Sequence, residues 1–185
     1  SCRKRKAVYE EICAWSGEKL KKIGERNIIM YACVRTDNME GTTLGKYTVS
    51  LKVDADIENG SVVVVGGLVE GEREVRTYTA PKGNEKLGKL ALVASPEVVK
   101  EKSHNSLADF INKKDEIARG YILVSGDMFS LTQKGFADGS VLNKGSIVEL
   151  DAGMKLKAVA TATSGKTKIG TIEAVEGSYY LVVVD

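Results

Sequence analysis

The sequence has little of what catalytic and membrane-spanning proteins commonly use. Its 185 residues include one histidine, one tryptophan and two prolines. No apolar run approaches the roughly 18 residues of a membrane-spanning helix, and the basic start lacks the apolar segment of a secretion signal. Neither a membrane span nor a signal peptide is therefore expected. The single histidine, His104, lies in a polar stretch with no cysteine or carboxylate cluster beside it, and we interpret it as a surface residue.

Cysteines are few and gathered at one end. Cys2, Cys13 and Cys33 all fall within the first 33 residues. They form no Cys-x-x-Cys pair, and no histidine lies near them to complete a zinc site. Three cysteines at one end also provide no disulfide framework for the rest of the chain. This usage is typical of a protein made in a reducing cytosol.

Signatures of phosphate binding and catalysis are missing as well. Ser164–Thr167 (Ser-Gly-Lys-Thr) resembles the end of a phosphate-binding loop, but that loop needs a glycine where Ala160 stands. It also needs a helix next, whereas strand-like residues follow. No nucleophile stands beside a base, and no pair of carboxylates is singled out. We therefore predict no catalytic, cofactor-binding or metal-binding residue, no cofactor and no enzymatic activity.

Oxygen-bearing side chains alternate in one short stretch, at Asp54, Asp56, Glu58 and Asn59. Such alternation resembles a loop that holds a hard cation. The spacing stops short of an EF-hand and lacks its distal glutamate. Solvated carboxylates in a turn are therefore the preferred interpretation.

Charge is divided unevenly along the chain. Residues 1–29 carry eight lysines and arginines against four glutamates, whereas the remainder carries 19 basic and 21 acidic residues. The main body is thus slightly acidic, and we do not expect it to bind nucleic acid. Three interpretations of residues 1–29 stay open. They are an amphipathic helix with a basic tail, a nucleic-acid-binding arm, or upstream sequence translated in error. The third is considered because GGA-GAG, a purine-rich ribosome-binding sequence, would encode Gly24-Glu25 at a plausible distance from a start codon at Met30.

The strongest structural signal lies between residues 57 and 68. Asn59-Gly60 predicts a two-residue hairpin turn with positive φ at both positions. Four valines follow and end at Gly66-Gly67, a pattern that predicts a strand covered on both faces. Gly145-Ser146, followed by Ile147–Leu150, is a weaker echo of this segment and predicts a second such strand.

Alternating apolar residues and turn signals predict the remaining elements. Residues 97–119 give the one helical region of the main body, with Ser106 as its N-cap and Leu107, Phe110 and Ile111 on one face. About nine strands at this spacing predict an all-β fold, a sandwich or barrel, with one short helix in the middle. Further strands are expected at 47–53, 74–79, 87–94, 120–127, 128–132 and 155–163, with a closing hairpin of 169–175 and 179–184.

These elements divide the chain into four parts. A basic N-terminal segment, 1–29, precedes a first β subdomain at 30–96. A helical linker, 97–119, leads to a second β subdomain at 120–185.

Residues 59–68, 118–132 and 156–175, together with 87–96, carry a resemblance to a known class of proteins. They resemble small structural proteins of tailed bacteriophages, described as head-stabilisation, decoration or head-fibre proteins. The resemblance covers residues 30–185 and supplies no site residues. It implies a non-enzymatic virion protein on the capsid exterior, synthesised in the host cytoplasm, bound to the major capsid protein and often a homo-oligomer. Strand addition at an exposed sheet edge would be a natural way to dock.

Two other classes of function remain open. A glycan-binding or host-surface-binding module would need exposed aromatic patches. An OB-like nucleic-acid binder would need a basic and aromatic strand face, which the slightly acidic main body does not favour.

Overall fold

The computed structural model describes residues 30–97 and 107–185. The predictions for residues 1–29, Cys2 and Cys13 among them, and those for His104 and Ser106 lie outside the described residues. Within the described ranges the regular structure is mostly β with little helix, which confirms the all-β prediction. No helix in these ranges is both long and apolar enough to cross a membrane.

Eleven strands form in the described part of the chain, and the helical elements are short. The helical elements are α2 (Glu40–Thr43) and the 3-10 turns η1 (Gly45–Tyr47), η2 (Leu87–Lys89), η3 (Leu107–Asp109) and η4 (Gln133–Gly135). The strands are β1 (Val34–Asn38), β2 (Thr48–Lys52), β3 (Val62–Leu68), β4 (Val75–Thr79), β5 (Leu90–Val93), β6 (Ile117–Ile122), β7 (Met128–Thr132), β8 (Ile147–Leu150), β9 (Leu156–Val159), β10 (Lys168–Glu176) and β11 (Tyr179–Val184).

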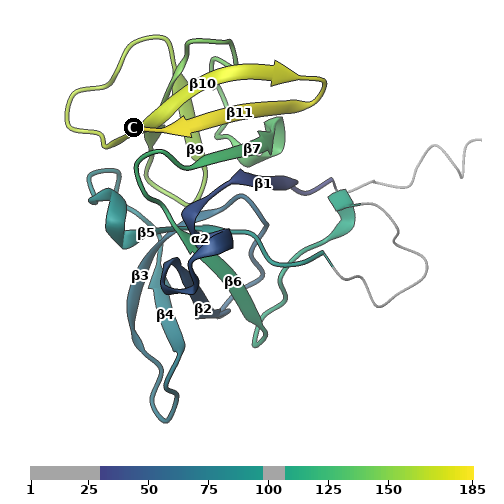
Figure 1. The fold of residues 1–185 in the computed structure, drawn as a ribbon, viewed down its shortest axis with the longest axis vertical. Helices are drawn as coiled ribbons and strands as arrows, with labels where there is room; N and C mark the ends of the chain where they lie inside the picture. Colours follow the sequence, from purple (N-terminus) through teal and green to yellow (C-terminus); the bar gives the residue numbers. More distant parts are fainter. Residues whose placement is uncertain (1–29, 98–106) are drawn as a thin grey trace, which may run out of the picture.

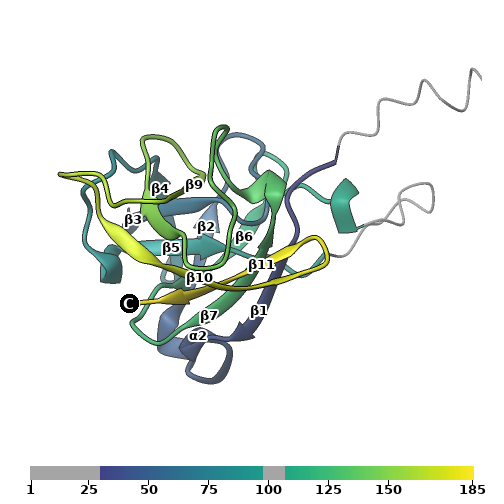
Figure 2. The same cartoon turned by 90° about the horizontal axis from the view of Figure 1, so that it is seen from above.

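The strands form two units. Strands β2-β4-β3-β5-β6 close into a barrel, in which β2 and β4 are the parallel pair. The other six form an antiparallel sheet in the order β1-β7-β11-β10-β8-β9. In Figure 1 the sheet occupies the upper half and the barrel the lower half. Figure 2, seen from above, places β10, β11, β7 and β1 in front of the fainter barrel strands β2 and β3.

The prediction that the valine run is covered on both faces is confirmed for its first half only. Side chains alternate across a strand, so Val62 and Val63 point in opposite directions. Val62 packs into the core between sheet and barrel, whereas Val63 packs inside the barrel, and neither is exposed. Burial of each contributes about 1.5–3 kcal/mol. Val64 and Val65 are partly exposed toward the end of the run.

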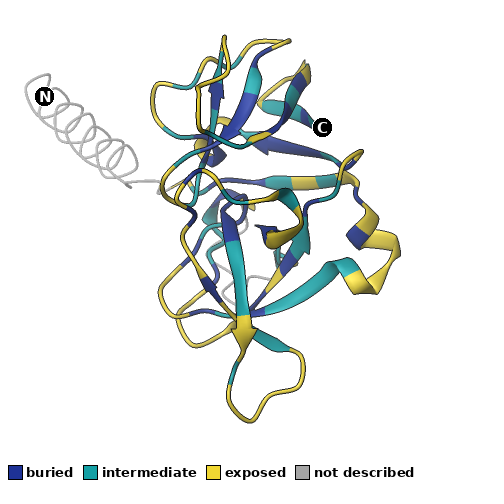
Figure 3. Cartoon of the chain, turned by 90° about the vertical axis from the view of Figure 1, so that its left-hand side faces the viewer, coloured by how far each residue is buried: buried dark blue, intermediate teal, exposed yellow. Residues whose placement is uncertain are grey.

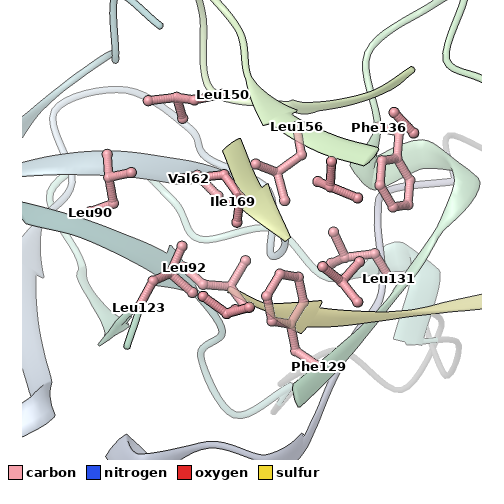
Figure 4. Close-up of a cluster of buried hydrophobic side chains, with 14 of the residues drawn as sticks. Val62, Leu90, Leu92, Leu123, Phe129, Leu131, Phe136, Leu150, Leu156 and Ile169 are labelled. Carbon is pink, nitrogen blue, oxygen red and sulfur yellow. The ribbon is translucent and has the colours of Figure 1, made fainter. Parts of the chain in front are cut away.

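One apolar core joins the sheet to the barrel. Leu90 and Leu92 of the barrel strand β5 share a buried cluster with Phe129 and Leu131 of the sheet strand β7. Figure 4 shows these side chains pointing toward one another across the space between the two units. Strand β1 belongs to the sheet with β7–β11, while β6 closes the barrel. The predicted boundaries at 96 and 120 therefore do not coincide with the division between barrel and sheet.

The predicted helical linker over 97–119 is wrong in its described part. Residues 107–109 form a single 3-10 turn, and Asn112 makes an antiparallel bridge with Ile57. Asp115 has a left-handed φ of 69°, which interrupts any helix. From Ile117 the chain pairs with β2 and β5 as strand β6. Leu107, Phe110 and Ile111 have helical spacing, but strand pairing with distant residues overrides that short local signal.

The Asn59-Gly60 hairpin is also wrong. Gly60 has a φ of 85°, but Asn59 is not among the described residues with positive φ. The flanking strands β2 and β3 are not neighbours, because β2 pairs with β4 and β6. The Gly60 amide donates to the Val93 carbonyl instead. The segment is thus a turn that leads into strand β3. Closure of the barrel places β3 beside β4 and β5, and not beside β2.

The two Gly-Ser segments do share a local geometry. The amides of Gly60 and Gly145 donate to the carbonyls of Val93 and Ile172, both at 2.7 Å. The amides of Val93 and Ile172 donate back to the serines that follow those glycines, Ser61 and Ser146. Gly145 has a φ of 88°, close to that of Gly60. The echo in the sequence therefore corresponds to a repeated way of starting a paired strand.

The predicted closing hairpin is confirmed. β10 and β11 pair antiparallel from Glu176–Tyr179 to Gly170–Val184, with one irregularity between Ile172 and Ala174. Gly177, at the turn, has a φ of 61°. A glycine adopts this conformation without a Cβ clash, which explains why the turn is placed here.

Candidate docking surfaces

The alternating carboxylates at 54–58 have separate partners. Asp54 accepts a hydrogen bond from the Tyr78 hydroxyl at 2.7 Å, and Asp56 forms an ion pair with Lys113 at 3.0 Å. Glu58 accepts from the Ala32 amide. Among the described residues, no group of three or more His, Cys, Asp or Glu side chains is placed to hold a metal ion. Asp54 and Asp56 are exposed turn carboxylates, as the preferred interpretation predicts, whereas Asn59 is buried.

Two other side chains singled out in the sequence also have structural roles. Lys166, from the segment that resembles a phosphate loop, pairs with Asp151 at 2.8 Å in the turn region before β10. Cys33 is a buried, free cysteine that forms no disulfide. Burial, followed by the negative charge of Glu97, raises the pKa of the Cys33 thiol. A thiol with a raised pKa stays protonated at neutral pH, so Cys33 is not activated as a nucleophile.

A row of side chains runs across the outer face of the six-stranded sheet. Directly opposed residues of an antiparallel pair point to the same face. Strand register aligns Met128 with Val183, Val183 with Thr171, Thr171 with Ile147, and Ile147 with Val159. These five uncharged residues, from β7, β11, β10, β8 and β9 in spatial order, form what we call the outer row.

The outer row faces away from the core. Val182 and Val184, the neighbours of Val183 in β11, lie in the buried cluster between sheet and barrel. No member of the outer row belongs to that cluster or to the barrel interior, and each is partly exposed. On one side the loop between β9 and β10 covers the face, where the Thr163 amide and hydroxyl donate to Glu149. The row itself is an uncharged strip of side chains on hydrogen-bonded strands.

A second candidate surface is the free edge of the sheet at β1. The Thr132 amide donates to the Cys33 carbonyl at 3.1 Å, and Val34 lies opposite Leu131. In an antiparallel ladder this makes Val34–Leu131 a non-hydrogen-bonded pair, so the Val34 N–H and C=O point away from β7. Within the described ranges these two groups have no hydrogen-bond partner. The other edge strand, β9, is covered, because Ala137 and Val141 donate to it.

A cleft of about 180 Å³ lies along this free edge. Val34 and Thr36 of β1 line one side, and residues 94–97 line the other. Figure 1 shows the chain after β5 running below β1, on the side away from β7. The sequence did not predict this juxtaposition, because the two walls are some 60 residues apart in the chain.

The wall formed by residues 94–97 is fixed by Asn59. Its side-chain amide accepts from the Ser95 amide and donates to the Ser95 carbonyl, each at 3.0 Å. The Asn112 side chain donates to the same Asn59 oxygen at 3.1 Å. A buried side chain that satisfies both main-chain groups of one residue holds that segment in place. This explains why Asn59 is buried and is not part of a solvated turn.

Glu97 is the charged residue of the cleft. Its Oε1 atom is buried and has no hydrogen-bond partner among the described residues. Burial raises the pKa of the Glu97 carboxyl, and a hydrogen bond with Asn59 opposes part of that shift. A buried carboxylate oxygen without a donor costs free energy, so burial disfavours the ionised form of Glu97.

We expect Glu97→Gln to stabilise the protein increasingly as the pH rises. A raised carboxyl pKa means that the folded chain holds its proton more tightly than the unfolded chain. The resulting stability is present below the ordinary value of 4.5 and is lost as the pH rises through the raised pKa. The melting temperature of the variant should therefore match the wild type near pH 4 and exceed it by pH 7. Glu173→Gln, on an exposed position of β10, is the matched control, and a difference that shrinks with rising pH would contradict the prediction.

Comparison of the chain with protein-family models, with curated proteins and with solved structures gave no match. No functional residue is therefore assigned by similarity.

The outward face of β2 and β6 on the barrel does not have the aromatic surface that an OB-like nucleic-acid binder would need. Outward-facing pairs across β2 and β6 are Thr48–Tyr121, Ser50–Arg119 and Lys52–Ile117. This face has two cations, and its one aromatic ring, Tyr121, packs against the core and lines the cleft. It therefore lacks a row of rings on which successive bases could stack.

The β3–β4 hairpin is a third exposed feature. Figure 3 shows its tip, at the bottom of the view, as a continuous exposed loop. Leu68 is 52% exposed at its base, but the tip itself carries Glu70, Glu72, Arg73 and Glu74. Such a charged loop is typical of a solvated turn, so the outer row and the β1 cleft remain the two candidate surfaces.

Proposed function

We propose that this protein is a non-enzymatic structural protein of a tailed-phage virion that binds the exterior of the capsid through the outer row. The observation that carries the proposal is the uncharged row itself, which crosses five strands and is partly exposed on the outer face of the sheet. Contiguous apolar surface on a soluble protein commonly marks an interaction site. The resemblance of residues 30–185 to capsid accessory proteins supplies the partner, the major capsid protein.

The physical character of the row suits a shell-binding protein. Its side chains stand on hydrogen-bonded strands, so little conformational freedom is lost when a partner covers them. Four of its members, Val183, Thr171, Ile147 and Val159, are β-branched and rotationally stiff. Each apolar Å² removed from water contributes about 25 cal/mol, so one small face gives modest affinity. Many identical shell sites and a homo-oligomeric form of the protein, which we also propose, would raise the apparent affinity by avidity.

Co-sedimentation with mature capsids of the parent phage tests this function. Wild-type protein should pellet with mature capsids, with unexpanded particles and unassembled capsid protein as controls. Thr171→Lys places a charge at the centre of the outer row and should lower the affinity about tenfold or more, because the contact would bury an unpaired ammonium group. Thr79→Lys makes the same change at an exposed position of strand β4 and should bind like the wild type.

Two results would contradict the proposal in different ways. Binding to neither particle form, together with firm binding to DNA or to host cell wall, would overturn the capsid function in favour of one of the alternatives. Capsid binding that Thr171→Lys leaves unchanged would show that another surface docks. Melting curves of both variants exclude unfolding as the cause of any loss.

A further inference from the structure

The β1 edge has the geometry that strand addition requires. The Val34 N–H and C=O point into the space beside the sheet and have no hydrogen-bond partner in the described part of the chain. A register shift between Arg35 and Asn38 confines the regular edge to the first half of β1. The cleft of about 180 Å³ leaves room along this edge, with Val34 and Thr36 on its wall. An extended backbone placed there would satisfy the free groups as a seventh strand.

The facing wall cannot supply that strand itself. Both main-chain groups of Ser95 are bound to Asn59, and the Ala94 amide donates to the Arg119 carbonyl. The Ser95 hydroxyl accepts from the Arg119 amide. This wall is therefore a fixed boundary that shapes the cleft, while β1 offers the free hydrogen-bonding groups.

We propose that the cleft takes an extended peptide from a partner protein, which pairs with the main chain of β1 and places a lysine or arginine side chain against Glu97. Glu97 is the one charged residue among the described residues that line the cleft. Its Oε1 atom is buried and lacks a donor. An ammonium or guanidinium group would satisfy that oxygen with a charge-assisted hydrogen bond.

Other occupants fit this chemistry less well. Nucleic acid would bring phosphate groups toward a carboxylate, so its backbone would be repelled. A second copy of this chain would present its own β1, whose cation, Arg35, lies over the Tyr179 ring at 5.0 Å. A compact organic cation could reach Glu97 but would leave the Val34 groups unpaired. A basic extended peptide satisfies the carboxylate and the strand edge together.

The full chain and synthetic heptapeptides test the proposal by calorimetry. The probes are acetyl-Ser-Thr-Val-Lys-Val-Thr-Ser-amide and the same peptide with norleucine in place of lysine. The lysine peptide should bind about tenfold tighter, and Glu97→Gln should abolish that preference. Glu173→Gln, on β10, is the matched control and should retain the preference. Affinity for the lysine peptide should fall as the pH is lowered, because protonation of Glu97 removes the charge that the lysine contacts.

N-methylated peptides separate strand addition from simple charge attraction. Alternate amides of an added strand face β1, and the others face away. Methylation of one alternate set should therefore abolish binding, while methylation of the other set should leave the affinity within about threefold of the parent peptide. Charge attraction alone would tolerate both sets.

Several results would overturn the inference. They are no binding at about 1 mM peptide, equal binding of the lysine and norleucine peptides, or tolerance of both methylated sets. Dimerisation of the chain that is lost in Val34→Pro, without peptide binding, would assign the edge to a second copy. The inference is independent of the proposed capsid function, because it concerns β1 and not the outer row. Thr171→Lys should leave peptide binding intact, so failure of either proposal can be told from failure of the other.

Discussion

Replacing Gly170 by alanine is expected to cost more than about 4 kcal/mol of unfolding free energy, an exceptional value for a single methyl group. Gly170 is buried in β10, opposite Val148 of β8 and Val184 of β11. A Cβ at this position would overlap the Val183 carbonyl oxygen and lie 3.0 Å from the Val184 Cα. Both obstacles are main-chain atoms of a paired strand, so no rotamer change can relieve the clash. The β10–β11 register itself would have to give way, and a one-residue slip turns every side chain to the other face.

Urea denaturation followed by circular dichroism measures this effect. Gly67→Ala is the control, because Gly67 also lies in a strand and lacks a positive φ. No heavy atom lies within 4 Å of the position that a Cβ would take there. That variant should be neutral or slightly stabilising, since alanine restricts the unfolded chain more than glycine does. A Gly170→Ala protein that loses less than about 1 kcal/mol would contradict the packing described for β10.

Gly60→Val is expected to cost about 2–6 kcal/mol, from two causes of similar size. The first is the φ of 85°, a conformation that a β-branched residue resists. The second is crowding, because a Cβ would lie 3.1 Å from Leu131 Cδ2 and 3.2 Å from Val34 Cγ2. Loss of this turn would also disturb β1, whose Val34 packs directly over it.

The Gly71→Val variant separates the two causes. Gly71 has a similar φ of 80°, but no heavy atom lies within 4 Å of the position that a Cβ would take there. Its substitution should therefore cost only the conformational strain, about 1–3 kcal/mol. The same urea titration measures both variants, and their difference gives the crowding at Gly60. Equal losses in the two proteins would mean that the sheet relaxes around the added methyl groups.

Strands with clear local patterns were predictable from sequence. The alternation at 47–53 and 74–79 corresponds to β2 and β4, and the paired runs at the end of the chain correspond to β10 and β11. In each case the periodicity of two and a glycine turn act over a few residues. Residues 107–111 show where such reasoning fails, because apolar residues three and four apart mimic a helix over a stretch too short to form one alone.

The outer row was not predictable in the same way. In β11 all six residues, Tyr179–Val184, are apolar or aromatic, so alternation cannot distinguish the face toward the core from the face toward solvent. Register with β7 and β10 decides which residues face outward. The β1 cleft was hidden for a related reason, since its walls meet only when β1 joins the C-terminal sheet and β5 joins the barrel.

The sequence by itself determined that this protein is built from β-strands, where most of those strands lie, and that Gly60 and Gly177 are turn residues. These features depend on side-chain period and on the freedom of glycine at positive φ, which are properties of a few neighbouring residues. Tertiary structure alone decided that the strands divide into a closed barrel and a six-stranded sheet. It also decided that the buried Asn59 side chain hydrogen-bonds both main-chain groups of Ser95, and that Glu97 lies beside a free strand edge. These features depend on pairing between residues far apart in the chain, which local propensity does not encode.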